Sequence, residues 1–90
     1  MNTIFTSEGW AHYLSWFHSG DKKAVKKINE LIEDIKKNGL LEGLGHPERL
    51  KYLEEERYSR EITHGDRLVY YQSEQGDLVI SACRGHYEGM

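Results

Sequence analysis

Two segments in the first half of the chain repeat apolar residues at the spacing of an amphipathic helix. These residues recur every three or four positions: Trp10, Tyr13, Leu14 and Phe17 in the first segment, and Ala24, Val25, Ile28, Leu31, Ile32 and Ile35 in the second. Ser7 precedes the first segment and is expected to cap that helix. Asp21 is expected to cap the second helix, and Gly39 is expected to end it.

The second half of the chain has the pattern of β-strands. Residues 57–63 and 78–84 alternate apolar and polar side chains, and residues 67–72 are rich in Val and Tyr. The turns between these strands are His64-Gly65-Asp66 and Glu74-Gln75-Gly76-Asp77. Strands joined by such short turns are expected to pair antiparallel. Residues 3–6 and 50–53 are expected to form two further short strands.

Helices that precede such a sheet predict an α+β fold, in which two N-terminal helices pack on a mainly antiparallel, twisted sheet. No linker divides the chain, so residues 1–90 are expected to form a single domain. The hydrophobic fraction of 38% and the aromatic fraction of 11% exclude collagen, coiled coil and intrinsic disorder.

Cysteine content and hydropathy narrow the class of protein further. The one cysteine, Cys83, excludes a disulfide framework and a CxxC zinc site. Its place in an alternating apolar strand predicts a buried, unreactive thiol. We see no signal peptide and no apolar run near the roughly 18 residues of a membrane span. A cytoplasmic protein is therefore expected.

The charge balance disfavours unaided binding to nucleic acid. Twelve Lys and Arg residues against fifteen Asp and Glu give a net charge of −3. Proteins that bind RNA or DNA by themselves usually carry a basic excess, because neutralising phosphates supplies much of their affinity.

Ionisable side chains nevertheless gather in the second half of the chain. They are Glu48, Arg49, Lys51, Arg57, Arg60, Arg67, Arg84 and His86. A base, cations and an acid are what metal-free RNA cleavage requires, because the ribose 2′-hydroxyl must lose a proton and the leaving 5′-oxygen must gain one. The simpler interpretation is a surface ion pair at Glu48, a solvated histidine, and arginine stems that cover the sheet. The residues alone leave both interpretations open.

The chain resembles the YoeB-type (Txe) toxins of the RelE superfamily in several separated segments. The similar helices are the early one with Trp10, Tyr13 and Trp16, and the later one with Lys22-Lys23-Ala24-Val25-Lys26-Lys27-Ile28-Asn29-Glu30-Leu31-Ile32. Four later motifs keep the order of the family: Gly45-His46-Pro47-Glu48-Arg49-Leu50-Lys51, Tyr58-Ser59-Arg60-Glu61-Ile62-Thr63, Asp66-Arg67-Leu68-Val69-Tyr70 and Ala82-Cys83-Arg84-Gly85-His86-Tyr87. The similarity covers nearly all ninety residues.

The resemblance implies the RelE-like microbial RNase fold and the toxin of a type II toxin–antitoxin system. Such toxins are ribosome-dependent mRNA endonucleases, which cut the codon in the ribosomal A site without a metal or a cofactor and so inhibit translation. The expected partners are a YefM-like antitoxin and the bacterial ribosome with its mRNA. Contact with DNA is expected only through the antitoxin, and a homodimer is one option for the assembly.

The resemblance also implies a role for individual residues. Glu48 would be the general base, Arg67 would stabilise charge on the scissile phosphate, and His86 would be the general acid. Four further residues would contact the substrate: Lys51, Arg60, Arg84 and Tyr87.

The chain departs from the family pattern near the expected RNA path. Glu61 stands where the family has a second arginine, and the acidic run Glu54-Glu55-Glu56 precedes the strand. Two alternatives stay open: one is a non-catalytic toxin with the RelE/ParE fold, and the other, which these acids motivate, is a protein-binding module that has lost catalysis. ParE-type toxins lack the set of Glu48, Arg67 and His86, so these three residues argue against the first alternative.

Overall fold

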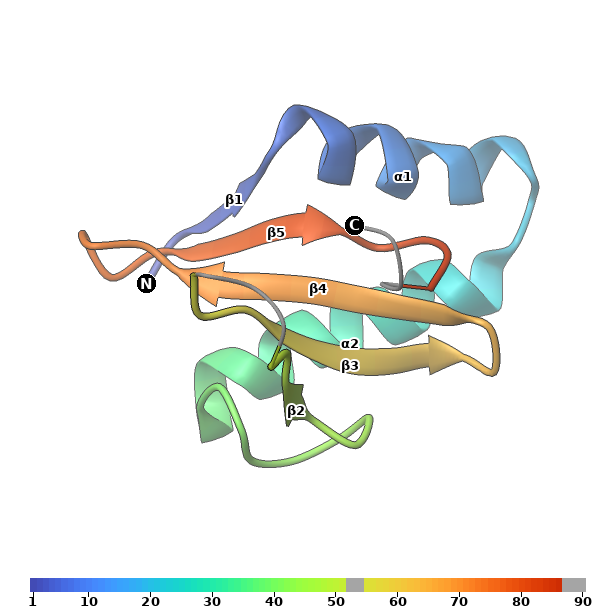
Figure 1. Ribbon diagram of the computed structural model, residues 1–90. Coiled ribbons are helices and arrows are strands. Elements are labelled where there is room, and N and C mark those ends of the chain that lie inside the picture. The colour runs from blue at the N-terminus through green and yellow to red at the C-terminus, as the bar shows by residue number, and fades with distance from the viewer. Residues whose placement is uncertain (52–54, 87–90) are drawn as a thin grey trace.

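The computed structural model describes residues 1–51 and 55–86 and has one layer of two helices on a five-stranded sheet (Figure 1). The elements are β1 (Thr3–Phe5), α1 (Ser7–His18), α2 (Lys22–Asn38), β2 (Glu48–Arg49), β3 (Tyr58–Thr63), β4 (Asp66–Gln72) and β5 (Leu78–Ala82). The predicted α+β fold is therefore confirmed. None of the helices within the described ranges is long and apolar enough to cross a membrane.

The sheet has the strand order β1-β5-β4-β3-β2. The β3–β4 and β4–β5 hairpins pair antiparallel across their short turns, as predicted. β1 pairs parallel with β5, so that Thr3 lies opposite Leu78 and Phe5 lies opposite Ile80. The sheet is mixed because the chain crosses through both helices and the β2–β4 strands before it returns beside β1.

The prediction of a strand at residues 50–53 is wrong by two residues. The strand is β2, in which Glu48 pairs with Ser59 and Arg49 pairs with Tyr58. Leu50 follows it and is buried in a small cluster with Val69 and Ala82, which explains why an apolar residue there resembles a strand interior. Residues 52 and 53 lie outside the described residues.

The N-cap of helix α1 lies one residue earlier than the expected cap, Ser7. The N-cap is Thr6, whose side-chain oxygen accepts a hydrogen bond from the Gly9 N–H at 3.0 Å. Thr6 also continues β1, because its own N–H donates to the Ile80 carbonyl. A Cβ on Gly9 would collide with that same carbonyl, so the glycine lets α1 lie directly against β5.

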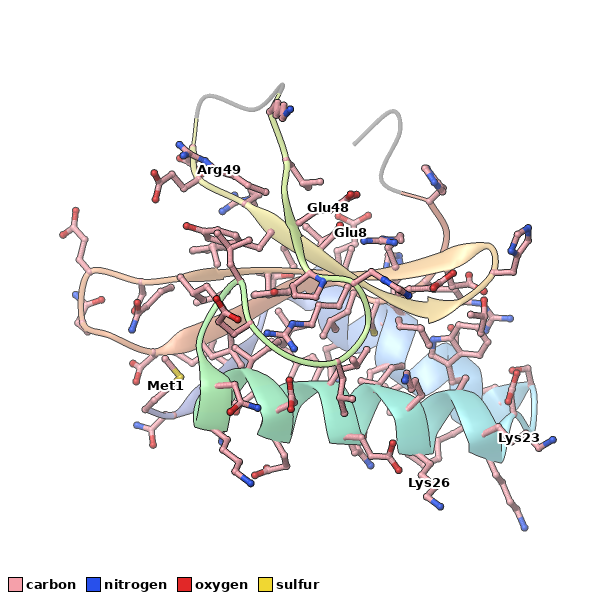
Figure 2. All side chains as sticks on the ribbon, turned by 90° about the horizontal axis from the view of Figure 1, so that it is seen from below. Met1, Glu8, Lys23, Lys26, Glu48 and Arg49 are labelled. Carbon is pink, nitrogen blue, oxygen red and sulfur yellow. The ribbon has the colours of Figure 1, made fainter. Side chains whose placement is uncertain are left out.

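Helix α2 has the predicted ends and the predicted buried face. The Asp21 carboxylate accepts from the Ala24 N–H, and Gly39 ends the helix with φ 100°. The buried residues of α2 are Ala24, Ile28, Leu31, Ile32 and Ile35, which pack on the inner face of the sheet in one core cluster. The basic side chains Lys23 and Lys26 point away from the sheet (Figure 2).

Cys83 follows β5 and is fully buried. Burial raises the pKa of its thiol to about 12, so the thiol stays protonated and weakly nucleophilic at neutral pH. The prediction of a buried thiol is confirmed, and Cys83 contributes to the core rather than to a reactive site.

Candidate active site

Glu48 and Arg67 meet on the face of the sheet that the helices leave uncovered. Figure 2 shows Glu48 on the side of the sheet opposite α2. Its carboxylate Oε1 lies 3.4 Å from Nη2 of Arg67, at the start of β4. The Glu48 side chain is 48% exposed, whereas that of Arg67 is 14% exposed. The carboxylate is therefore accessible to a ligand, and the guanidinium is held mostly within the protein.

Ser59 fixes the orientation of the Arg67 guanidinium. Its hydroxyl oxygen accepts from Arg67 Nη2 at 3.0 Å and from Nε at 3.3 Å. The His46 carbonyl accepts a longer bond of 3.4 Å from Nη2. Sequence reasoning missed Ser59 as a site residue. Strand alternation and the antiparallel hairpin, which pairs Ser59 with Val69 two residues from Arg67, were the signals that could have found it.

The backbone brings His86 to the same end of the sheet as Arg67. The Arg67 N–H donates to the Gly85 carbonyl at 2.9 Å, and the Gly85 N–H donates to the Asp66 carboxylate at 2.7 Å. These two bonds attach the segment after β5 to the start of β4. His86 follows directly and is exposed. A carboxylate, a guanidinium and an imidazole are thus positioned by β2, β4 and the segment after β5.

Two acids of the Glu54–Glu56 run are paired with neighbouring arginines. Glu55 lies 2.9 Å from Arg57, and Glu56 lies 2.9 Å from Arg49. The Arg57 guanidinium also stacks on the ring of Tyr71, 3.9 Å from its centre. These carboxylates are therefore partly neutralised, while Glu54 lies outside the described residues.

The prediction that Arg60 contacts the substrate is wrong, because its side chain is 0% exposed. It points into the helix-covered side of the sheet, where the five N–H groups of a guanidinium all find acceptors. These are the Tyr70 hydroxyl (2.9 Å), the Asp34 carboxylate (2.6 Å) and the carbonyls of Leu44 (3.0 Å), Gly39 (2.8 Å) and Glu42 (2.7 Å). The residue is structural.

The remaining predicted contact residues differ in their placement. Lys51 is exposed just after β2, where a substrate could reach it. Arg84 turns instead towards α1, since it donates to the Ser15 hydroxyl at 2.9 Å and stacks 4.0 Å from the centre of the Trp16 ring. The predicted substrate contact of Arg84 is therefore not supported by its placement. Tyr87 lies outside the described residues.

The site is equipped for proton transfer beside a fixed cation. Within residues 1–51 and 55–86, no cluster of three or more His, Cys, Asp or Glu side chains could hold a metal ion. The chemistry available from the described side chains is acid–base catalysis by carboxylate and imidazole, with charge stabilisation by guanidinium.

Known proteins resemble this chain both in fold and in sequence. The toxin YoeB of Escherichia coli K12 is 46% identical over 87 residues, which are 97% of this chain and 100% of that protein. The structure of a YoeB dimer from Staphylococcus aureus is 44% identical, with a TM-score of 0.85 and coverage of 97% and 98%. The YoeB of a heterotetrameric YoeB–YefM complex from S. aureus matches with a TM-score of 0.83, at 44% identity and the same coverage.

The fold and these full-length matches define a toxin of the RelE superfamily. Residues 5–87 match the family described as the YoeB-like toxin of bacterial type II toxin–antitoxin systems. The chain belongs to this family of toxins.

The ion pair between the buried Arg60 and the largely buried Asp34 makes stability depend on pH in a defined window. The Leu44 N–H, and with it the Arg60 guanidinium, holds the pKa of Asp34 below its ordinary value. A group with a depressed folded-state pKa stabilises the fold above its unfolded pKa, and that stabilisation is lost as the pH falls through the folded value. We expect Asp34→Asn to lower the free energy of unfolding by about 3–5 kcal/mol at pH 7.

This difference between wild type and Asp34→Asn should begin to shrink below about pH 4, where Asp34 of the unfolded chain takes up a proton, and should be lost as the pH falls through the lower pKa of Asp34 in the folded protein. Urea denaturation of both proteins between pH 7 and pH 2 measures it. Glu30→Gln, which changes an exposed acid of the same helix, is the control and should show little difference at any pH. An Asp34→Asn deficit that stays constant down to pH 2 would contradict the assignment.

Proposed function

We propose that this toxin is a ribosome-dependent mRNA endonuclease that cleaves the codon in the A site. The observation that supports it best is the contact between Glu48 and Arg67, 3.4 Å apart on the open face of the sheet. A base beside a fixed cation is the arrangement needed where a hydroxyl is deprotonated next to a phosphate. The segment that carries His86 is attached to Arg67 by the hydrogen bond from the Arg67 N–H to the Gly85 carbonyl.

The proposed reaction uses one side chain for each movement of charge. Glu48 takes the proton of the ribose 2′-hydroxyl, and the 2′-oxygen forms a bond to the adjacent phosphorus. Arg67 stabilises the negative charge that grows on the phosphoryl oxygens. The bond from phosphorus to the 5′-oxygen breaks, and His86 donates a proton to that oxygen. The products are a 2′,3′-cyclic phosphate and a 5′-hydroxyl.

The fixed geometry of Arg67 favours this role. The Ser59 hydroxyl and the His46 carbonyl already hold its guanidinium, so little reorganisation is needed when the phosphorane forms. Lys51, exposed beside β2, would add a phosphate contact. Tyr87 would help to place the substrate, in keeping with the resemblance of the chain end to the family motif.

The charge distribution supports delivery of the mRNA by the ribosome. The net charge is −3, and Glu56 and Glu55 are paired with Arg49 and Arg57. Little affinity for RNA from counterion release is therefore available to the toxin alone. A ribosome that holds both the toxin and the mRNA would supply the missing binding energy.

A YefM-like antitoxin is the proposed protein partner, with DNA contacted only through it. The heterotetrameric YoeB–YefM complex and the YoeB dimer of S. aureus support an antitoxin complex and a homodimer. Blocking access to Glu48 and Arg67 would be enough for such a partner to silence the toxin.

The first prediction of this proposal concerns substrate delivery. Purified toxin should cleave mRNA on programmed bacterial ribosomes and leave the same mRNA intact without ribosomes, because its affinity for RNA by itself is low. Primer extension on both samples measures the cleavage. Toxin with Arg67→Ala, prepared in the same way, controls for contaminating nucleases. Equal cleavage of naked and ribosome-bound mRNA would contradict the proposal.

The second prediction concerns the division of catalytic roles. Glu48→Gln and His86→Ala should each slow single-turnover cleavage by about 10²–10⁴-fold, and Arg67→Ala by about 10²–10³-fold, since one charge-stabilising donor is lost. His64→Ala changes an exposed histidine in the β3–β4 turn and should keep the wild-type rate.

Each variant must first show a folded thermal transition. A 2′-deoxy nucleotide at the cut position should abolish cleavage, because the attacking oxygen is missing. Wild-type rates in folded His86→Ala, or cleavage of the 2′-deoxy substrate, would refute the mechanism.

The third prediction concerns toxicity and its control. Expression of the toxin alone should stop bacterial growth, and co-expression with its YefM-like antitoxin should restore growth and yield a complex that copurifies. Glu48→Gln should leave growth intact and still copurify, since the substitution keeps the size of the side chain. A wild-type chain that is harmless by itself would favour the binding module without catalysis.

A further inference from the structure

The buried Arg60 holds the loop that leads to Glu48. We call residues 39–45 the carbonyl loop, because five of its carbonyls accept hydrogen bonds from β3 and β4. Three of them, in Gly39, Glu42 and Leu44, accept directly from Arg60. The other two are the carbonyl of Leu40, which accepts from the Tyr70 hydroxyl at 2.6 Å, and that of Gly45, which accepts from the Glu61 N–H at 2.7 Å.

Tyr70 and Asp34 connect Arg60 to the same loop from two other elements. The Tyr70 hydroxyl accepts from Arg60 Nε while it donates to the loop, and burial raises the pKa of Tyr70 so that the hydroxyl keeps its proton. The Asp34 carboxylate, on α2, accepts from both Arg60 and the Leu44 N–H. α2, β3 and β4 therefore all bond to the loop, and Arg60 joins their side chains to one another.

The packing leaves the loop little freedom. A Cβ on Gly43 would collide with the Asp34 carboxylate, and a Cβ on Gly45 would lie 2.8 Å from a methyl group of Leu31 and 3.1 Å from Cβ of Arg60. Gly45 also has a φ of 83°, which favours glycine. The loop thus has one well-defined path along β3.

The carbonyl loop runs directly into the candidate active site. Glu48 lies three residues after Gly45, and His46 between them has a φ of 52° and accepts from Arg67. At β3, Glu48 pairs with Ser59, the neighbour of Arg60. Successive residues of a strand point to opposite faces. On one face of β3, Ser59 therefore binds Arg67, and on the other face Arg60 binds the carbonyl loop that leads to Glu48.

We propose that Arg60 is a positioning residue for Glu48, which acts through the carbonyl loop and sets the place of the base opposite Arg67. This inference rests on the proposed function for its effect on cleavage, while its structural part can be measured without activity. Arg60 itself, fully buried, touches no substrate.

The test uses two variants that weaken the hydrogen bonds between Arg60 and the carbonyl loop without removing the buried charge. Tyr70→Phe keeps the ring in the core and deletes the hydroxyl that joins Arg60 to Leu40, and Arg60→Lys keeps the charge but loses the forked donors. Misplacement of the base should lower the single-turnover rate constant by about 10–100-fold, while the half-saturating ribosome concentration stays near the wild-type value. Tyr58→Phe is the matched control, because its hydroxyl contacts Glu56 and not the loop, and it should keep the wild-type rate.

A double-variant cycle separates positioning from general destabilisation. If Arg60 and Tyr70 act through Glu48, Tyr70→Phe should cost little in a Glu48→Gln background, where the base is already absent. The same loss in both backgrounds, or an equal loss in Tyr58→Phe, would overturn the proposal.

Hydrogen exchange tests the link independently of activity. In Tyr70→Phe the amides of residues 44–46 and 48–50 and of Glu61 should exchange faster than in wild type, while those in the middle of α2 should not change. Unchanged exchange at residues 44–46 and 48–50 in both Tyr70→Phe and Arg60→Lys would overturn the proposal. An inactive wild-type toxin on ribosomes would count against the proposed function instead, and the exchange data would then decide the link by themselves.

Discussion

The burial of one guanidinium is the constraint on which this structure depends. A charge removed from water costs several kcal/mol unless every donor is paired, and Arg60 is fully buried. Asp34 supplies the opposite charge from α2, and the carbonyls of residues 39–44 supply the other acceptors together with Tyr70. Helix, loop and sheet are therefore held in one arrangement, because moving any of them would leave a buried donor without its acceptor.

Strand β3 divides structural and chemical tasks between its two faces. Arg60 faces the core, whereas Ser59 holds Arg67 on the open face. Glu61 is in register with Arg67 on the neighbouring strand, so it adds a second carboxylate near the cation that Glu48 contacts. This departure from the family pattern lowers the positive charge at the proposed phosphate site, and it leaves Glu48 and Arg67 in contact.

The sequence was informative where local patterns determine structure. The apolar stripe and the caps of α2 predicted that helix correctly, and the turns at residues 64–66 and 74–77 predicted both hairpins. The burial of Arg60 could not be predicted from such local patterns. An arginine on a strand resembles a surface residue, and its burial depends on backbone carbonyls 16 to 21 residues earlier in the chain, which leave no side-chain signature. The parallel pairing of β1 with β5 is likewise set by long-range packing.

The arginines of this toxin differ in how readily they could bind a phosphate. The pairs of Arg49 with Glu56 and Arg57 with Glu55 involve well-exposed carboxylates, and such surface pairs contribute at most about 1 kcal/mol each. A phosphate could replace those carboxylates at little cost, whereas nothing can replace the acceptors of Arg60 without unfolding the loop. Arg67 lies between these extremes, since it is oriented by Ser59 and yet contacts the exposed Glu48. A fixed cation stabilises a transition state better than it attracts a substrate from solution, so this division of charge agrees with the proposal that the ribosome brings the mRNA to the toxin.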